Sequence, residues 1–548
     1  MPLQKNQVLT LRVERLSSDG SGVAHSPDGE TVFIPGAAPG DEARVRIVKD
    51  CKRYAFGILD EVLTPSPDRI PADCAVAGPC GGCSLRHLDY AAELRAKQEN
   101  VADAFARIGG LDVPVLPIVG SPEVNRYRNK VQFPVGVDKN GKPCIGFYAG
   151  RTHRIVPCPD CRLQPGVLNE IGNALCAFFA EKGIQPYSEE TGKGLVRHIF
   201  LRRGAHSGQI MVCLVCTRAK LPYTEELCTR LKTQFTEITT ILLNVNAKNT
   251  NVILGTETHT LYGPGYIEDT LCGVPVQLGP LSFYQVNTLA AEQLYGIAAQ
   301  YAQLTPDDLL LDLYCGMGTI GLSMAVHCRE LVGVEIVPEA IESAKANAAR
   351  MGADVAAKSR FFCADAGQAA TQLAAEGLHP DVVMLDPPRK GCDEATLSAV
   401  VRMSPRRVVY VSCNPATAAR DAAWLEQNGY HAEKVQPVDL FPRTRHCEAV
   451  LLLTKLHVER HIEVDVNMEE LDVTAAESKA TYNEIRNHVW EHYQLKVSNL
   501  YIAQVKQKYS IIERENYHKA KNENAKQPKC PKEKEDAIVE ALKHFQMI

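Results

Sequence analysis

The chain has 548 residues, of which 45% are hydrophobic and 23% charged, and its formal net charge is −5. This composition is typical of a multidomain globular protein, and the net charge excludes a uniformly basic coat for nucleic acid. There is no run of about 18 apolar residues and no apolar signal core at the N-terminus, so we expect a cytoplasmic protein, without membrane contact and monomeric. Because cytoplasmic thiols stay reduced, the 19 cysteines should serve packing, catalysis or metal binding rather than disulfides.

Residues 5–65 alternate short β-branched stretches with turn residues, and Pro65 and Pro67 follow them. About five strands at this spacing predict a small β-barrel of the oligonucleotide-binding type. Basic side chains beside Tyr54 and Phe56 favour RNA contact, since aromatic rings stack on bases and cations neutralise phosphates. A solvated barrel face is an equally simple interpretation. The basic side chains are Arg44, Arg46, Lys49, Lys52 and Arg53.

A loop rich in glycine and proline carries Cys74, Cys80 and Cys83. Loops bury little surface, so packing is a weak explanation for three cysteines so close together. Thiolates at this spacing suit zinc or an iron–sulfur cluster, and both need a fourth ligand. Cys158 and Cys161, in a second short loop, are the candidates for that ligand.

The region between this loop and residue 280 reads as an α/β insert. Apolar residues recur at helical spacing over residues 88–108, before the pair Gly109-Gly110, and residues 120–280 alternate strands with helices. Each basic group alone is better explained as a solvated surface, but several of them in one region favour a groove for nucleic acid. These groups are Arg126, Arg128, Lys130, Arg151, His153, Arg154, Arg197, His198, Arg202 and Arg203.

A nucleotide-binding core follows. A buried strand over residues 309–313 leads into a Gly-x-Gly-x-x-Gly turn that contains Gly316 and Gly318. The next strand ends at Glu335, about 20 residues after the turn, where a carboxylate accepts hydrogen bonds from ribose hydroxyls. A third strand ends at Asp365. This order predicts a doubly wound sheet, and a dinucleotide is the competing ligand because NAD enzymes share the glycine turn.

Two further apolar strands end at Asp386 and Cys413. Ligands and chemistry occur at the carboxyl ends of strands in open α/β sheets. From its strand alone, Cys413 is either a nucleophile or a small buried residue, since free cysteine is among the most buried residue types.

Six motifs in this region resemble those of the uracil-5 RNA methyltransferases that use S-adenosylmethionine, specifically the group acting on 23S ribosomal RNA. They are FYQVN at 283–287, DLYCGMGTIG at 312–321, GVE at 333–335, DPPRKG at 386–391, SCNP at 412–415 and FPRTRHCE at 441–448. The N-terminal barrel resembles the TRAM domain of that family. The cysteine loop is similar to the family's iron–sulfur site, which implies a [4Fe–4S] cluster and Cys161 rather than Cys158 as the fourth ligand.

The resemblance also implies the chemistry and the site. Cys413 would add to C6 of uracil and Glu448 would remove the C5 proton, while a salt bridge from Glu448 to Arg445 is the alternative role for that carboxylate. The target base would be extruded from folded RNA. The expected cofactor-binding residues are Gln285, Tyr314, Gly316, Gly318, Glu335 and Asp386, with Asp365 a weaker candidate.

We therefore predict a doubly wound Rossmann-like methyltransferase domain with an N-terminal barrel, a central α/β insert and a C-terminal helical extension. The expected domains are residues 1–66, 67–280, 281–455 and 456–548, the last with helices near 475–493 and 534–545 and no assigned role. A tRNA uracil-5 methyltransferase is the alternative, against which the cysteine loop argues. A catalytically silent RNA-binding protein is the other alternative, and the presence of Cys413 and Glu448 argues against it.

Overall fold

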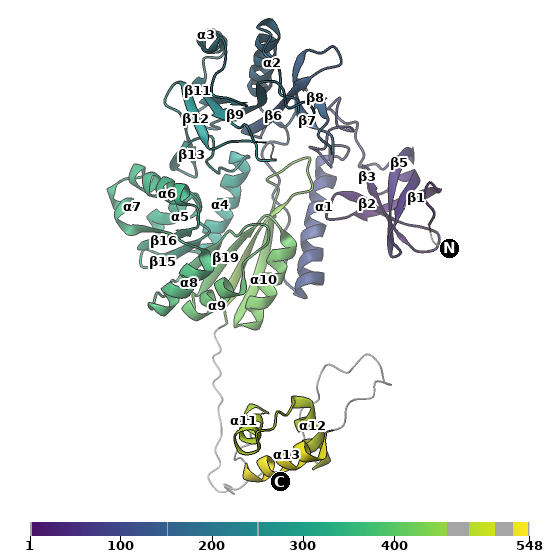
Figure 1. Cartoon of the computed structure of the whole chain (residues 1–548), viewed down its shortest axis with the longest axis vertical. Helices are drawn as coiled ribbons and strands as arrows, with labels where there is room; N and C mark the ends of the chain where they lie inside the picture. The colour runs from purple at the N-terminus through teal and green to yellow at the C-terminus, as the bar shows by residue number, and fades with distance from the viewer. Residues whose placement is uncertain (1–2, 151, 249–250, 457–481, 510–529, 546) are drawn as a thin grey trace. The chain divides into compact units, whose positions relative to one another are not determined.

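The computed structural model describes residues 3–150, 152–248, 251–456, 482–509, 530–545 and 547–548 (Figure 1). The chain divides into two compact units, Met1–His457 and Val458–Ile548. The first unit holds a small barrel and two seven-stranded sheets, and the described part of the second is helical. The predicted fold class is confirmed. The division of residues 1–455 into three domains stays a prediction.

The N-terminal strands form a closed barrel in the order β1-β2-β3-β5-β4. Alternate residues of β1 and β4 point inward, because successive side chains of a strand face opposite sides, and Leu11, Val13, Val45 and Ile47 fill the interior. The barrel expected from the sequence is thus present. Its strands are β1 (Val8–Leu16), β2 (Ser21–His25), β3 (Thr31–Pro35), β4 (Glu42–Asp50) and β5 (Tyr54–Thr64).

A long helix leads from the cysteine loop to the catalytic sheet. Helix α1 (Tyr90–Asp103) is capped by Asp89 and continues as a π-helical turn, η1 (Ala104–Gly109), which ends where Gly110 adopts φ 63°. The chain then runs beside β20 of the catalytic sheet, where Val115 and Val119 form bridges. The helix predicted over residues 88–108 is therefore present and packs on the catalytic domain.

The central sheet has the order β12-β11-β10-β9-β6-β7-β8, and its main core lies beneath α2 and α3. The helices are α2 (Gly166–Glu181) and α3 (Thr224–Gln234). The strands are β6 (Lys130–Val137), β7 (Pro143–Tyr148), β8 (Ile155–Pro157), β9 (Val196–Arg203), β10 (Ile210–Cys216), β11 (Ile238–Val245) and β12 (Glu257–Tyr262).

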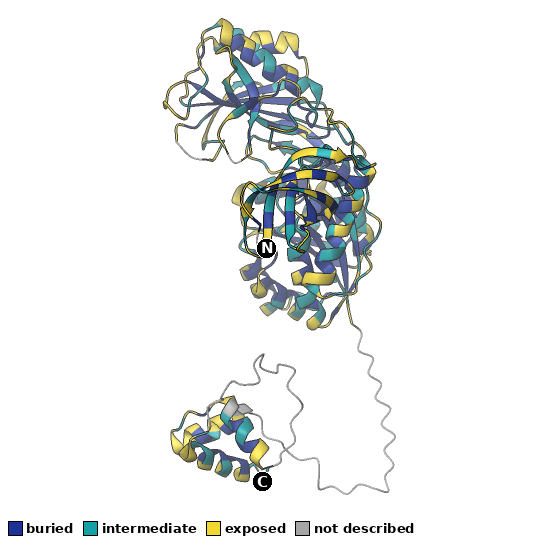
Figure 2. Ribbon diagram, turned by 90° about the vertical axis from the view of Figure 1, so that its right-hand side faces the viewer, coloured by how far each residue is buried: buried dark blue, intermediate teal, exposed yellow. Residues whose placement is uncertain are grey.

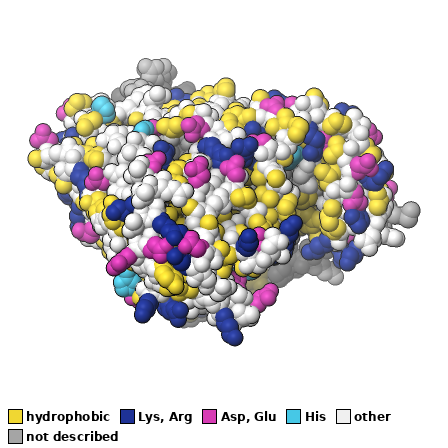
Figure 3. All heavy atoms as spheres, turned by 90° about the horizontal axis from the view of Figure 1, so that it is seen from above, with side chains coloured by type: hydrophobic (Ala, Val, Ile, Leu, Met, Phe, Trp, Pro, Cys, Tyr) yellow, Lys and Arg dark blue, Asp and Glu magenta, His cyan; other side chains and the backbone are white. Residues whose placement is uncertain are grey.

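The prediction of a basic surface on this domain is wrong for three of its residues. Arg197, His198 and Arg202 are buried, because β9 lies inside the sheet and apolar cores pack against both of its faces. Arg202 is only 1% exposed and donates hydrogen bonds to the carbonyls of Gly279 and Ser282, at 2.8 and 2.7 Å. On the face shown in Figure 3, Lys and Arg side chains lie scattered among acidic and apolar ones. This face therefore carries no continuous basic groove.

The catalytic sheet has the order β17-β16-β15-β18-β19-β21-β20, and its first five strands run parallel. Its inner strands are buried on both faces, which fits their continuous apolar runs (Figure 2). The strands are β15 (Leu309–Leu313), β16 (Glu330–Glu335), β17 (Ser359–Cys363), β18 (Val382–Leu385), β19 (Arg407–Ser412), β20 (Tyr430–Val438) and β21 (Glu448–Lys455).

Helices cover the faces of this sheet, as the predicted doubly wound order requires. A separate hairpin, β13 (Ile267–Leu271) and β14 (Val274–Leu278), precedes the domain and packs on α6 and α5. The helices are α4 (Thr288–Ala302), α5 (Thr319–Met324), η2 (Ala325–His327), α6 (Pro338–Arg350), α7 (Ala353–Lys358), α8 (Ala366–Ala375), α9 (Glu394–Met403) and α10 (Pro415–Gln427).

The second unit has a small apolar core of its own. It contains α11 (Tyr482–Tyr493), α12 (Asn499–Lys508) and α13 (Lys532–His544). Ile485, Val489, Ile502, Ile538 and Leu542 are buried between these helices. Residues 475–481 of the predicted extension helix lie outside the described residues. Within the described part of the chain, no helix is long and apolar enough to span a membrane.

Candidate active site and cysteine cavity

The register of the catalytic sheet brings the predicted cofactor residues to one edge. Leu313 at the end of β15 pairs with Leu385 at the end of β18. Because both strands run parallel, Tyr314 and Asp386 leave the sheet side by side at its carboxyl edge. Glu335 ends the neighbouring strand β16 at the same edge.

The nucleophile and base candidates meet at this edge as well. Ser412 in β19 pairs with Ala449 in the antiparallel strand β21, so the next residue, Cys413, lies opposite Glu448. Asn414 then starts helix α10 as its N-cap and donates its backbone N–H to the Ser412 hydroxyl at 3.0 Å. Cys413 is thereby held between a strand end and a helix start, half-buried.

The local electrostatics favour proton transfer. Burial, followed by the charge of Asp386, raises the pKa of Glu448 to about 8, and Arg389 opposes this rise. Burial alone raises the pKa of Asp386 to about 7. Burial, Glu448 and Asp386 also raise the pKa of the Cys413 thiol, against Arg389. A buried carboxyl that titrates near neutral pH is suited to act as a general base.

The alternative role of Glu448 as a partner of Arg445 finds no contact to support it. The Arg445 guanidinium instead lies toward the barrel, where its Nη1 is 3.4 Å from the Asp19 carbonyl oxygen. Glu448 is 6% exposed and has no ion pair among the residues that the structure describes.

The glycine turn is shaped to bring the backbone close to a ligand. Gly316 and Gly318 have φ of 55° and 79°, a left-handed conformation that favours glycine. Glu335 Oε2 accepts a hydrogen bond from the Gly316 amide at 3.1 Å, so the acidic residue and the turn are joined. Tyr314 also has a positive φ, 66°, which is uncommon for a residue with a side chain and is found at functional sites. Asp365 caps helix α8 by accepting from two amides of its first turn.

The FYQVN segment, residues 283–287, is joined to the central sheet. The Asn129 amide donates to the Gln285 carbonyl at 2.8 Å and to the Thr288 hydroxyl at 2.9 Å, which ties the segment to the central sheet. Phe283 in the same segment is 72% exposed. An exposed aromatic ring here was not singled out from the sequence, because a phenylalanine is normally expected in a core. The FYQVN motif, which contains Phe283, was the sequence signal that could have identified it.

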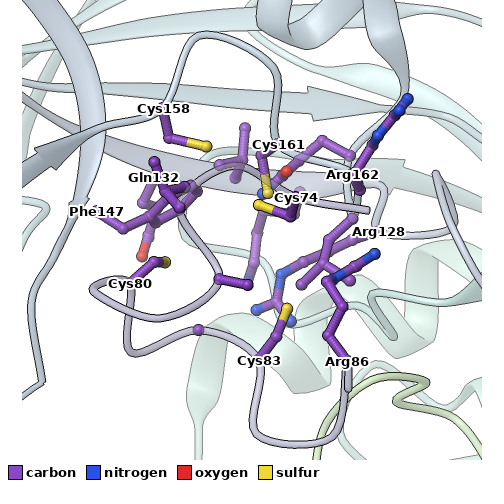
Figure 4. Close-up of a pocket in the computed structure, with 17 residues that line it drawn as sticks. Cys74, Cys80, Cys83, Arg86, Arg128, Gln132, Phe147, Cys158, Cys161 and Arg162 are labelled. Carbon is purple, nitrogen blue, oxygen red and sulfur yellow. The ribbon is translucent and has the colours of Figure 1, made fainter. Parts of the chain in front are cut away.

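The predicted metal ligands line one cavity of about 280 Å³, to which two loops contribute. The sulfur atoms of Cys74, Cys80, Cys83, Cys158 and Cys161 point into a common space (Figure 4). Within the described residues, however, no group of three or more Cys, His, Asp or Glu side chains could hold a metal ion. The structure therefore shows five cysteines around one cavity, without an assembled set of metal ligands among the described residues.

The cavity also holds a buried cation. Arg86 is 3% exposed, and its Nη1 donates to Asp73 Oδ1 at 2.5 Å and to Asn125 Oδ1 at 3.0 Å. The guanidinium also interacts with the Cys83 sulfur, and a positive charge there favours the thiolate form of a cysteine. Thiolates are ligands of both zinc and iron–sulfur clusters, so the residue types alone fit either group. Cys158 and Cys161 both line the cavity, and the choice of Cys161 as fourth ligand stays a prediction.

Comparisons with known proteins agree with this site. Residues 276–456 match the tRNA (Uracil-5-)-methyltransferase family and residues 2–59 match the TRAM domain. An uncharacterized RNA methyltransferase of Halalkalibacterium halodurans is 43% identical, over 82% of this chain and 98% of its own length. One from Clostridium tetani is 41% identical over 83% of this chain and 98% of its own.

A solved structure shares most of the architecture. The Pyrococcus abyssi tRNA (uracil-54, C5)-methyltransferase, in complex with S-adenosyl-L-homocysteine, aligns with a TM-score of 0.65 and 27% identity. The alignment covers 81% of this chain and all of that one. Fold and site define an RNA methyltransferase of the Rossmann-like class with an N-terminal barrel. The chain belongs to the S-adenosylmethionine-dependent RNA (uracil-5-)-methyltransferase family with a TRAM domain.

Proposed function

We propose that the protein methylates C5 of a specific uridine in 23S ribosomal RNA through a covalent bond between Cys413 and C6 of the uracil. The observation that carries this proposal is the register of β19 and β21, which sets Cys413 opposite Glu448. Asp386 lies at the same edge, close enough to raise the pKa of both groups. A nucleophile and a base thus face one reaction space.

The reaction needs both groups because C5 of uracil is a poor nucleophile. The Cys413 thiolate adds to C6, and the electron pair of the C5–C6 double bond forms an enolate that makes C5 nucleophilic. S-adenosylmethionine, when bound, would supply the methyl group to C5 and leave as S-adenosyl-L-homocysteine. Glu448 then takes the C5 proton, the double bond re-forms, and the bond between sulfur and C6 breaks to release the thiolate.

The remaining edge residues are proposed to hold the cofactor. Gly316 and Gly318 let the backbone approach it, and Glu335 would accept hydrogen bonds from ribose hydroxyls. Tyr314 and Asp386, which leave neighbouring strands together, lie between this turn and Cys413. Gln285 approaches on the separate FYQVN segment, and Asp365 remains the weaker candidate, because its carboxylate already caps α8.

We also propose that the cysteine cavity holds a [4Fe–4S] cluster bound by Cys74, Cys80, Cys83 and Cys161. Four thiols converging beside the buried Arg86 support this assignment. The cysteines lie outside the catalytic sheet, so the cluster would have a structural role in shaping the face that holds RNA.

Transfer RNA is the second candidate substrate. The likeness to the Pyrococcus abyssi enzyme, which is named for uracil-54 of tRNA, favours it. The cysteine cavity favours ribosomal RNA, because this pattern resembles the group of the family acting on 23S RNA.

The test is to trap the covalent bond. RNA containing 5-fluorouracil should give a denaturation-resistant adduct, because fluorine at C5 cannot leave as a proton. The adduct should form with 23S RNA fragments rather than tRNA, disappear in Cys413→Ala, and persist in Cys363→Ala, an exposed cysteine at the end of β17 on the same sheet edge. An adduct that survives Cys413→Ala would refute the mechanism, and one that forms only with tRNA would refute the ribosomal substrate.

A further inference from the structure

The segment of residues 439–447 joins β20 to β21 and ends directly at Glu448. It lies among parts of the chain that are far away in sequence. The Leu440 carbonyl accepts a hydrogen bond from Asn287 in the FYQVN segment at 3.0 Å, and the Pro442 carbonyl accepts one from the Tyr127 hydroxyl at 3.0 Å. These contacts anchor the segment on the side of the central domain.

Two more contacts anchor the segment near the cysteine loop and the barrel. The Leu85 amide, two residues after Cys83, donates to the Arg443 carbonyl at 3.1 Å. Arg445 reaches the Asp19 carbonyl in the barrel at 3.4 Å. Arg443 itself has φ 69°, a conformation that costs free energy for a residue with a side chain. The surrounding contacts must therefore offset this cost and hold the backbone in that conformation.

A buried charge cluster lies beneath the segment. Lys97 of helix α1 is 1% exposed, and its ammonium donates to Glu93 Oε1 at 2.7 Å, Asp439 Oδ1 at 2.8 Å and the Phe441 carbonyl at 3.2 Å. All three ammonium protons thus have acceptors. Two of these acceptors, Asp439 Oδ1 and the Phe441 carbonyl, belong to the segment. Arg443 completes the cluster, with Nη1 3.6 Å from Glu93 Oε2.

The carboxylates of this cluster bind the backbone of the segment directly. Glu93 Oε1 also accepts from the Arg443 amide at 2.7 Å, and Asp439 Oδ1 accepts from the Phe441 amide at 3.0 Å. Asp439 Oδ2 accepts from the Tyr90 hydroxyl at 2.9 Å. Two cations balance two carboxylates, so each member becomes an uncompensated buried charge when a partner is removed.

We propose that this cluster of Glu93, Lys97, Asp439 and Arg443 holds segment 439–447 in the one conformation that places Glu448 for proton removal from C5. These are positioning residues, since none of them is expected to touch the substrate. The inference rests on the proposed function, because it concerns the step assigned to Glu448. Cys413 directly follows β19 and is held between Ser412 and Asn414, so adduct formation depends much less on the cluster.

The test separates the two chemical steps in the full-length protein. Adduct formation is measured with 5-fluorouracil RNA, and proton removal is measured as release of the methylated product from uridine RNA in a single turnover. Asp439→Asn should slow product release about 10-fold or more while adduct formation changes less than about 3-fold, and the adduct on uridine RNA should accumulate. If Asp439→Asn fails to fold, Tyr90→Phe removes only one hydroxyl and should give a smaller change in the same ratio.

Asp308→Asn is the matched control. Asp308 is also a buried carboxylate, paired with Arg406 at 2.6 Å, but it precedes β15 at the opposite edge of the same sheet. It should lower stability without changing the ratio of the two rates. A proportional loss of both rates in Asp439→Asn, or an unchanged ratio in both cluster variants, would overturn the inference. The proposed function fails separately, if wild-type protein forms no Cys413-dependent adduct.

Discussion

The sheet edge and the cysteine cavity are assembled in different ways. At the edge, Tyr314, Asp386 and Cys413 each follow the last residue of a strand, and hydrogen-bonded register fixes their neighbours. The cavity is lined mainly by residues of loops, including residues 74–86 and 158–164, and no group of its described side chains is placed to hold a metal ion. Backbone pairing therefore builds the first site, whereas the second depends on what its side chains bind.

This difference teaches where each site is vulnerable. Register at the edge is maintained by buried strands, so a side chain there can change without moving its neighbours. The cavity instead concentrates thiols around the buried Arg86. A bound cluster contributes directly to folding stability, because the unfolded chain does not present such a site. Variants at the edge should therefore change the rates of the chemical steps. Variants in the cavity should change the iron content and the stability of the protein.

The largest expected effect is at the edge. Glu448→Gln keeps the shape of the side chain but removes the base, so turnover should fall about 10²–10⁴-fold. Addition of Cys413 to C6 does not need this base, and the covalent adduct on uridine RNA should therefore accumulate. Gel electrophoresis under denaturing conditions measures the adduct, and transfer of a labelled methyl group measures turnover.

Glu433→Gln, an exposed position on β20, is the control and should leave both measurements unchanged. Loss of turnover in Glu448→Gln without any adduct would contradict the division of roles between the two groups. Glu448 would then be needed for the addition of Cys413 to C6, rather than for the later removal of the C5 proton.

The next effect concerns the cavity. Cys80→Ala removes a proposed ligand, so the purified protein should lose most of its iron and its visible absorbance. We expect Tm to fall by about 5 °C or more, because the cluster stabilises only the folded chain. Cys144→Ala is the control, since Cys144 lies in β7 and does not line the cavity. Equal iron content in both variants would show that the cavity holds no cluster.

The sequence predicted the edge better than the cavity for a physical reason. A strand followed by Cys413 or Asp386 places that residue at the carboxyl edge whatever the loops do, because parallel strands share their direction. The motifs then supplied the roles. The cysteine spacing indicated a metal site, but the structure alone shows that Arg86 is buried beside Cys83.

Buried polar contacts between segments that are distant in the chain could not be predicted from the sequence. Glu93 and Lys97 have the spacing of an ordinary surface ion pair on a helix, and only the fold shows that Asp439 completes a buried cluster with them. Arg202 was similarly expected on a basic surface, because its position inside the sheet depends on strand order. Strand order follows from long-range packing, which local patterns do not specify.

A smaller effect tests the edge through stability. Burial raises the pKa of Glu448 from 4.5 to about 8, so the folded state binds this proton more tightly than the unfolded state does. That contribution is complete below about pH 4.5 and is lost as the pH rises through about 8. Glu448→Gln has no such loss. The free energy of unfolding of Glu448→Gln minus that of wild type should therefore be larger at pH 9 than at pH 5, by about 2–4 kcal/mol.

Denaturant unfolding at the two pH values measures this difference, with Glu433→Gln again as the control because its carboxyl is exposed. A constant difference between variant and wild type across this range would mean that Glu448 ionises normally. It would then be a weak base at the working pH, contrary to its proposed role.

The smallest effect distinguishes the two candidate ligands within the cavity. Cys158 is 3% exposed and lies beside Cys161, yet the proposed cluster uses only Cys161. Cys158→Ala removes one buried sulfur atom and should cost about 1 kcal/mol of stability with the iron retained. Cys161→Ala should lose iron to the same extent as Cys80→Ala. The reverse pattern would make Cys158 the fourth ligand, and iron retention in both variants would require a ligand from elsewhere.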